Sequence, residues 1–181
     1  MLISESYRAL NAELHARNPT YGTSGSKWVA KVYRFARQYE ATTVLDYGCG
    51  RGTFKPVMLQ LIPDAIIREY DPGVVGKDLL ELDPVDYVVC TDVMEHVEEN
   101  HVDATLRLLS WFTKYGIFFN IDTALSRSFL PNGQNTHITI YPADWWLKKL
   151  DDLIPDMEWQ IHEKTRSRLV VSGRRVQRDI F

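Results

Sequence analysis

The stretch VLDYGCGRGTF (44–54) decides the fold. Its first residues are mostly apolar and predict a buried strand, its glycines predict a tight turn, and a helical pattern follows over 54–62. Glycine tolerates a positive φ, and the missing Cβ lets a ligand approach the backbone closely. A buried strand that runs through such a turn into a helix predicts a binding site for a dinucleotide or a nucleoside cofactor.

Short apolar runs alternate with helical patterns on the C-terminal side of this stretch. Strands buried on both faces are expected at 42–47, 65–70, 86–91 and 116–121. Helices are expected at 54–62, 100–113 and 143–150, and two last strands at 157–163 and 168–173. The alternation predicts an α/β fold with a mostly parallel sheet, helices on both faces and an antiparallel C-terminal hairpin at one edge.

The N-terminal side predicts a helix over 3–16, a loop over 18–25 and a second helix over 26–39. We find no internal repeat or linker, so we expect one domain over 1–181. Within it, 1–40 supplies N-terminal helices and a lid loop, and 41–181 forms the α/β core.

The composition excludes several classes of protein. The 181 residues carry a formal net charge of −3 and are 45% hydrophobic, which is typical of one globular domain and does not indicate a nucleic-acid or membrane protein. Two cysteines without a CxxC pair argue against a disulfide framework or a zinc knuckle. Neither a signal-like start nor a membrane-spanning run is present, so we expect a cytoplasmic protein with no membrane partner.

The spacing of the glycine turn favours one kind of cofactor. A dinucleotide site needs G-x-G-x-x-G, but Thr53 stands where the third glycine would fall after Gly48 and Gly50. Asp46, two residues before Gly48, would repel a pyrophosphate and attract a cationic amino-acid group. Asp71 ends the next strand, where a carboxylate accepts hydrogen bonds from ribose hydroxyls. We therefore favour S-adenosylmethionine over a dinucleotide.

The segments VLDYGCGRGTF, REYDP and DYVVCTDVMEHV resemble, in order and spacing, three motifs of the class I S-adenosylmethionine-dependent methyltransferases, which have a Rossmann-like sheet. The resemblance implies methyl transfer with S-adenosylhomocysteine as product. It also implies that Asp46, Gly48 and Gly50 hold the methionine part, that Asp71 binds the ribose, and that Asp78 and Leu79 border the adenine. The loop style is similar to that of small bacterial and phage methyltransferases.

The loop over 18–28 lies where such enzymes often carry a lid. Tyr21 and Lys27 are candidates for cofactor contacts, with Lys27 meeting the cofactor carboxylate. The alternative makes Trp28 a core residue and Lys27 part of a solvated face. Both interpretations stay open at this point.

The acceptor is predicted to be an oxygen or nitrogen of a small molecule or nucleotide. The chain has neither the N-P-P-Y/F turn nor the Pro-Cys pair of DNA methyltransferases. A base near neutrality assists methyl transfer, and His137 and His96 are the candidates. Asp92 and Glu95 accompany them beside the cofactor. The sequence predicts no oligomeric state.

Asp92, Glu95, His96 and the later His137 also resemble the E-x-x-E-H segment and distant histidine of small-RNA 2′-O-methyltransferases, and ubiquinone-type O-methyltransferases carry a related segment. The resemblance implies a divalent metal and an RNA acceptor as an alternative. Asp92 replaces the first glutamate, and similar segments occur in methyltransferases without metal, so metal is not the favoured interpretation. A second alternative is a cofactor-binding protein without catalysis.

Overall fold

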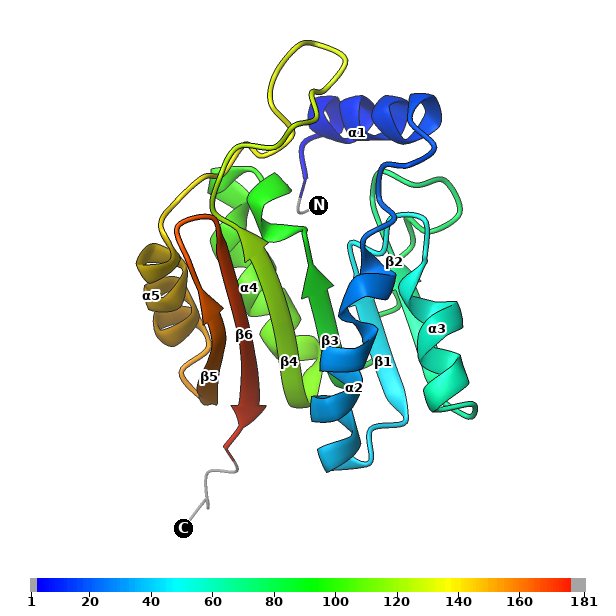
Figure 1. Cartoon of the computed structure of the whole chain (residues 1–181), viewed down its shortest axis with the longest axis vertical. Coiled ribbons are helices and arrows are strands. Elements are labelled where there is room, and N and C mark those ends of the chain that lie inside the picture. Colours follow the sequence, from blue (N-terminus) through cyan, green and yellow to red (C-terminus); the bar gives the residue numbers. More distant parts are fainter. Residues whose placement is uncertain (1–2, 177–181) are drawn as a thin grey trace.

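Six strands form one sheet in the order β2–β1–β3–β4–β6–β5 (Figure 1). The computed structural model describes residues 3–176. The strands are β1 Thr43–Tyr47, β2 Ile66–Tyr70, β3 Val85–Thr91, β4 Thr113–Asp122, β5 Met157–Lys164 and β6 Arg168–Arg175. The first four are parallel, whereas β6 pairs antiparallel with both β4 and β5. This confirms the predicted α/β sheet with its C-terminal antiparallel hairpin.

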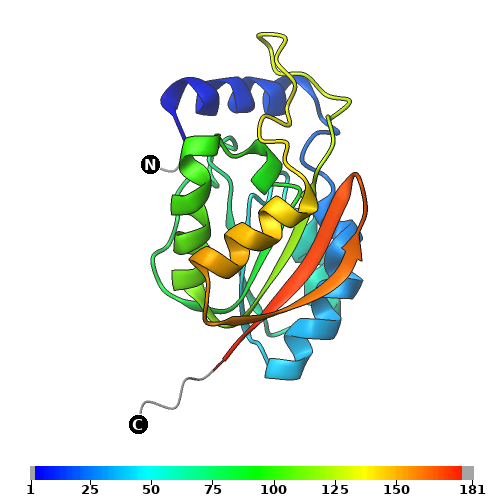
Figure 2. The same cartoon turned by 90° about the vertical axis from the view of Figure 1, so that its left-hand side faces the viewer.

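Helices cover both faces of this sheet (Figures 1 and 2). The α-helices are α1 Glu5–Arg17, α2 Val29–Ala36, α3 Phe54–Leu61, α4 Glu99–Phe112 and α5 Ala143–Leu153. Three short 3-10 turns are η1 Gly25–Trp28, η2 Arg37–Tyr39 and η3 Met94–His96. The helix expected over 26–39 is therefore divided into η1, α2 and η2, which continue one another along the chain.

One apolar core lies between the sheet and the helices α4 and α5. Leu106 and Leu109 of α4 are fully buried, as is Trp146 of α5. The spacing of three residues puts Leu106 and Leu109 on one face of α4. Each fully buried aliphatic side chain contributes about 1.5–3 kcal/mol to hydrophobic stabilisation, so this face holds α4 and α5 firmly on the sheet.

A second core lies on the opposite face, under α2 and α3. Val32 and Ala36 of α2 and Phe54 of α3 are completely buried there. Trp28 belongs to the same core and is only 8% exposed, whereas Lys27 is exposed. Trp28 is therefore a core residue, as one of the two interpretations of the 18–28 loop predicted.

The carboxyl ends of the parallel strands are covered by α1 and by the loop over 123–142 (Figure 2). Tyr7 and Leu14 of α1 pack against Leu130 of that loop in a small apolar cluster of their own. The side chain of Ser4 caps α1 by accepting a hydrogen bond from the Tyr7 N–H at 3.2 Å. Together α1 and the loop over 123–142 form a roof, as we call these two segments, over the edge of the sheet where α/β proteins bind ligands.

Within residues 3–176, no helix is both long enough and apolar enough to cross a bilayer. Cys49 and Cys90 are buried free thiols.

Candidate active site

The glycine turn between β1 and α3 is shaped by its lack of side chains. Gly48 and Gly50 have φ values of 76° and 52°, a region that L-residues with a Cβ rarely adopt. A Cβ on Gly48 would lie 2.2 Å from a methyl group of Val93, and one on Gly50 would lie 2.5 Å from the carbonyl oxygen of Gly22. The turn is therefore in close contact with both the β3 end and the lid loop.

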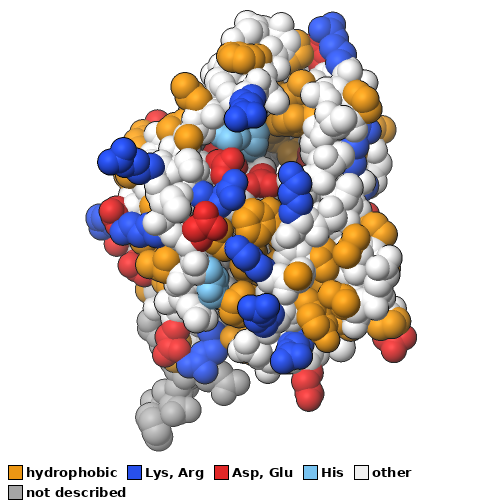
Figure 3. All heavy atoms as spheres, in the orientation of Figure 1, with side chains coloured by type: hydrophobic (Ala, Val, Ile, Leu, Met, Phe, Trp, Pro, Cys, Tyr) orange, Lys and Arg blue, Asp and Glu red, His pale blue; other side chains and the backbone are white. Residues whose placement is uncertain are grey.

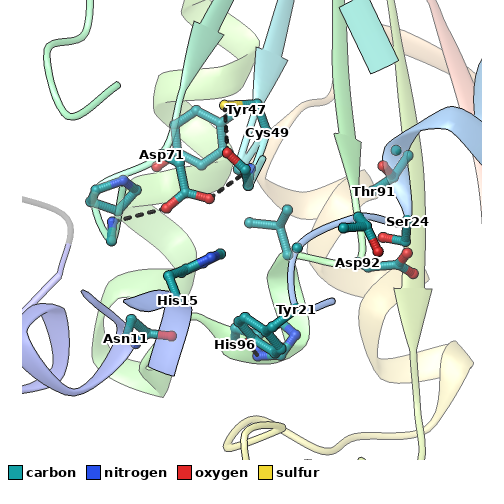
Figure 4. A pocket seen from close by; sticks show the side chains of 18 of the residues that line it. Asn11, His15, Tyr21, Ser24, Tyr47, Cys49, Asp71, Thr91, Asp92 and His96 are labelled. Carbon is teal, nitrogen blue, oxygen red and sulfur yellow. Dashed lines mark hydrogen bonds between the residues drawn. The ribbon is translucent and has the colours of Figure 1, made fainter. Parts of the chain in front are cut away.

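Two carboxylates, those of Asp46 and Asp71, flank this turn, and Figure 4 shows Asp71. Asp71, just after β2, accepts hydrogen bonds from the Gly50 N–H at 2.9 Å and from the Gly73 N–H at 2.8 Å. Asp46, on β1, is 2% exposed, and one of its carboxyl oxygens is buried without a hydrogen-bond partner among the described residues. Burial, reinforced by the nearby Glu69, raises the pKa of Asp46 to about 8. Because burial disfavours the ionised form of this carboxyl group, a cationic partner that stabilises the negative charge would bind favourably here.

A cavity of about 320 Å³ opens beside the turn and the carboxylates. Its lining includes Asp46, Gly48, Gly50 and Asp71 from the strand ends. Tyr21 and Lys27 line it from the lid loop and Asp92 and His96 from the segment after β3. Figure 3 shows a hollow with histidine and acidic side chains inside it and lysine and arginine side chains around it. The structure thus brings most of the predicted site residues to one cavity.

Asp78 and Leu79, predicted to border an adenine, do not line this cavity. Asp78 is 3.6 Å from the guanidinium of Arg8 on the outside of α1, and Leu79 is 86% exposed. The chain over 71–84 forms no strand, and its course turns these side chains outward. The structure therefore does not bring Asp78 and Leu79 to the wall of this cavity, and their contact with an adenine stays a prediction.

Asp92 follows β3 in a strained backbone conformation, with φ 57°. One carboxylate oxygen accepts a hydrogen bond from the Asn120 side chain, and the other accepts one from the Trp28 indole N–H at 3.4 Å. Both partners come from the sheet and its core, so the position of this carboxylate on the cavity wall is fixed by rigid elements.

His96 lies on the cavity wall and His137 lies behind it, with ring centroids 4.8 Å apart. Each Nδ1 contacts a backbone carbonyl, that of Thr136 at 2.7 Å for His96 and that of Ala124 at 2.6 Å for His137. A carbonyl only accepts, so each Nδ1 carries the proton and each Nε2 offers a lone pair. Burial and the neighbouring His137 lower the pKa of His96 to about 3. His96 is therefore neutral at any ordinary pH.

Glu95 is completely buried next to these histidines. One side-chain oxygen accepts a hydrogen bond from the Asp122 N–H at 3.2 Å, and the other has no partner among the described residues. Burial, with the nearby Asp92, raises the pKa of Glu95 well above its usual value. Its backbone carbonyl accepts hydrogen bonds from the N–H groups of Ile138 and Thr139, each at 3.0 Å. Glu95 thus ties the 136–139 segment to η3.

Glu95, His96 and His137 also form a candidate metal group. One ligand atom from each lies within 4.8 Å of the others. Two atoms that bind the same ion at about 2.1 Å stand at most about 4.2 Å apart, so the group has to contract slightly to hold an ion. Asp92 is not in this group: it clusters with Glu95 and Asp122 instead.

Three residues of α1 that the sequence did not single out line the cavity from above, namely Tyr7, Asn11 and His15. His15 points toward the middle of the cavity in Figure 4, and its Nδ1 is buried without a partner among the described residues. Burial lowers the pKa of His15. The spacing of four residues was an available signal, because it puts the three side chains on one helix face.

A strand–glycine turn–helix unit with acidic residues at two strand ends and a covered cavity defines a class I methyltransferase fold. The family model described as a methyltransferase domain matches residues 8–168, and the chain belongs to that family. No curated protein matches the chain by sequence.

Many solved structures share the fold. Magnesium protoporphyrin IX methyltransferase from Synechocystis PCC 6803, with bound SAH, is 15% identical over 83% of each chain, with a TM-score of 0.58. The Burkholderia thailandensis 1,6-didemethyltoxoflavin-N1-methyltransferase is 12% identical over 98% of this chain and 92% of its own, with a TM-score of 0.66. The methyltransferase domain of bacterial CtHen1-CN is 14% identical over 82% of this chain and 98% of its own, with a TM-score of 0.60.

Proposed function

We propose that this methyltransferase binds S-adenosylmethionine in the cavity beside the glycine turn and methylates an oxygen or nitrogen of a small acceptor. The observation that carries the proposal is the convergence of Asp46, the glycine turn and Asp71 on one covered cavity. Each of these groups has unused binding capacity that matches a different part of the cofactor.

The residues present fit the cofactor. The unpartnered oxygen of Asp46 suits the ammonium group of the methionine part, and Lys27 on the cavity wall suits its carboxylate. Asp71 accepts one N–H on each oxygen and keeps further lone pairs for ribose hydroxyls. Gly48 and Gly50 line the cavity without side chains, which lets a ligand approach the backbone of the turn. The bound cofactor supplies an electrophilic methyl group.

His96 is the proposed acceptor-facing residue. Its neutral ring offers Nε2 as a hydrogen-bond acceptor, because Nδ1 donates to the Thr136 carbonyl. A histidine with a pKa of about 3 holds a proton weakly, so its main contribution is to orient an acceptor O–H or N–H. His137, whose ring is 4.8 Å from that of His96, supports the same polar wall from behind.

The size of the cavity favours a small acceptor. Its volume of about 320 Å³ is near the lower end of the about 300–1,000 Å³ typical of small-molecule sites. The cofactor takes up much of this space. Two of the structural neighbours are named for small-molecule acceptors, a magnesium porphyrin and a didemethyltoxoflavin, which supports a small molecule and not a macromolecule as acceptor here.

Isothermal titration calorimetry tests the proposal. We expect the protein to bind S-adenosylmethionine and S-adenosylhomocysteine and not NAD. Asp46→Asn is expected to weaken binding at least tenfold. Asp83→Asn is the matched control, since Asp83 is exposed and is 3.9 Å from Arg68 outside the cavity. Absence of binding to both adenosyl ligands would refute the proposal.

A second candidate is metal-assisted methylation of an RNA end. The grouping of Glu95, His96 and His137 favours it, since histidines whose Nδ1 donates to a carbonyl are typical metal ligands. The segment that includes α2 adds exposed Lys31, Arg34 and Arg37, which suit an anionic acceptor, although Glu163 lies 4.0 Å from Lys31.

Titration with Mn²⁺ or Zn²⁺ separates the two candidates. Metal-assisted transfer requires that the protein binds the metal ion and that His137→Ala abolishes this binding. His101 lies on α4 outside the metal group, so His101→Ala should bind the metal as wild type. If methylation of an identified acceptor persists in EDTA and gains nothing from Mn²⁺ or Mg²⁺, the second candidate is excluded.

A further inference from the structure

One part of the roof over the cavity is formed by Ser4, α1 and the loop that follows α1, and we call these residues 4–23 the cap. The cap is held at its N-terminal end by Glu98, which accepts hydrogen bonds from the Ser4 N–H at 2.7 Å and from the Ser4 hydroxyl at 2.8 Å. Glu98 lies two residues after His96. This end of the cap is therefore tied to the segment that carries the acceptor-facing histidine.

The C-terminal end of the cap is held by Arg51, a residue of the glycine turn. Its guanidinium donates to the backbone carbonyls of His15 at 2.6 Å and Asn18 at 3.0 Å, and its Nε donates to that of Tyr21 at 3.2 Å. Its own N–H donates to the Gly22 carbonyl at 2.8 Å. One residue thus satisfies four carbonyl groups of the cap.

These contacts suit an arginine for two reasons. The carbonyls at the end of α1 carry the negative end of the helix dipole, and a cation there is favourable. They also lie in different directions, which the fork of guanidinium donors can reach simultaneously and a single ammonium group cannot.

The joint between the cap and the turn is close as well as hydrogen-bonded. A Cβ on Gly50 would lie 2.8 Å from the Cα of Gly22. His15 and Tyr21, whose carbonyls Arg51 holds, both have side chains on the cavity wall, and the Tyr21 hydroxyl lies 3.5 Å from Nδ1 of His96 (Figure 4). Any shift of Arg51 therefore moves groups that face the ligand.

We infer that Arg51 is a positioning residue that latches the cap onto the cofactor-binding turn and so closes the cavity over the bound nucleoside. The inference rests on the proposed function. In this inference the ligand leaves faster when the cap lifts, and the Arg51 contacts oppose that motion. Arg51 touches the cap backbone and not the cavity, so it acts through Tyr21 and His15.

The test compares Arg51→Ala, Arg51→Lys and the control Arg17→Ala. Arg17 also lies at the end of α1 but, within residues 3–176, pairs only with Glu13, at 2.5 Å. Two quantities are measured: the dissociation rate of S-adenosylhomocysteine by stopped-flow, and hydrogen exchange of the cap amides in the ligand-free protein.

We expect Arg51→Ala to raise the dissociation rate about tenfold and cap exchange several-fold, with exchange in β4 unchanged. Arg51→Lys is expected to fall between this variant and wild type, and Arg17→Ala to match wild type. Unchanged dissociation and unchanged exchange would overturn the inference. If Arg51→Ala does not fold, Arg51→Lys carries the same comparison.

The two proposals fail in different ways. If S-adenosylhomocysteine does not bind to the wild type, the proposed function fails. Cap exchange in the ligand-free variants still decides whether Arg51 is a latch. If the ligand binds and no variant changes either quantity, only the role of Arg51 is lost.

Discussion

The Gly50 N–H donates to the Asp71 carboxylate at 2.9 Å, which joins the turn after β1 to the end of β2. The other oxygen of Asp71 accepts the N–H of Gly73 at 2.8 Å. This carboxylate therefore organises two backbone segments at the cavity before any ligand arrives. Removing it affects both the shape of the site and its capacity to bind ribose hydroxyls.

Asp71→Ala is expected to weaken binding of S-adenosylmethionine by about 1–3 kcal/mol, because hydroxyl partners and two backbone donors are left unmet. Calorimetry gives the dissociation constant. Asp83→Ala is the matched control and is expected to bind as wild type, since Asp83 is exposed and lies 3.9 Å from Arg68 outside the cavity and the cap. Equal losses in the two variants would show that the effect is not specific to the site, and an unchanged constant in Asp71→Ala would remove Asp71 from the site.

Cofactor affinity is expected to rise with pH between about 6 and 7.5. The pKa of Asp46 is raised to about 8 by burial, so the free protein holds a proton there that the ionised, cofactor-paired state does not. Binding at pH 7 therefore releases a proton. Calorimetry in two buffers of different ionisation enthalpy measures this release, and Asp46→Asn should eliminate it. A pH-independent affinity in wild type would contradict the assignment.

Acid is expected to destabilise the fold through His96. Its folded pKa is lowered to about 3, so below pH 6.5 the unfolded chain binds a proton that the folded protein does not, and stability is lost as the pH falls. Between pH 7 and pH 5 we expect His96 to lower the free energy of unfolding by about 2 kcal/mol. Comparing the urea unfolding of wild type with that of His96→Gln at both pH values measures this contribution. The raised pKa of Glu95 acts in the opposite direction, because that contribution to stability is lost as the pH rises. Identical pH dependence in the two proteins would refute the role of His96.

Gly48→Ala is expected to lower the free energy of unfolding by about 1–3 kcal/mol from its positive φ alone, with a further loss from contact with Val93. The double variant with Val93→Ala relieves the contact but not the backbone strain. Unfolding of both single variants and the double variant forms a double-mutant cycle. Strict additivity would indicate that the methyl groups of Val93 do not limit the turn.

The fold was predictable because its determinants are local. The buried apolar run over 86–91 predicts a strand, and the structure has β3 there. The helical spacing of Val102, Leu106 and Leu109 predicts a helix, and the structure has α4 there with all three side chains buried. Asp46 and Asp71 stand at strand ends, and parallel neighbours bring such ends to one edge. The strand pattern, together with the parallel order of β1 and β2, was sufficient to predict that Asp46 and Asp71 lie close together.

The roof was harder to predict because it depends on contacts that are distant in sequence. His15 reaches the cavity only because α1 crosses the sheet edge, held by Glu98 and Arg51. The family resemblance implies that Leu79 borders the adenine, yet the chain after β2 is irregular there and leaves Leu79 exposed to solvent. His137 was expected over the cavity, and the structure places it behind His96 instead.

The left-handed backbone of Asp92 limits which replacements are informative there. Aspartate and asparagine are among the few residues with a side chain that accept this conformation readily, so alanine would alter the main chain and the charge together. Asparagine keeps the shape and removes the negative charge, and its amide nitrogen, which only donates, gives up one of the two hydrogen bonds that the carboxylate accepts from Asn120 and Trp28. A single-base change in the gene can make this replacement, so natural selection, like the experimenter, can adjust the electrostatic field at the cavity wall there without rebuilding the loop that carries it.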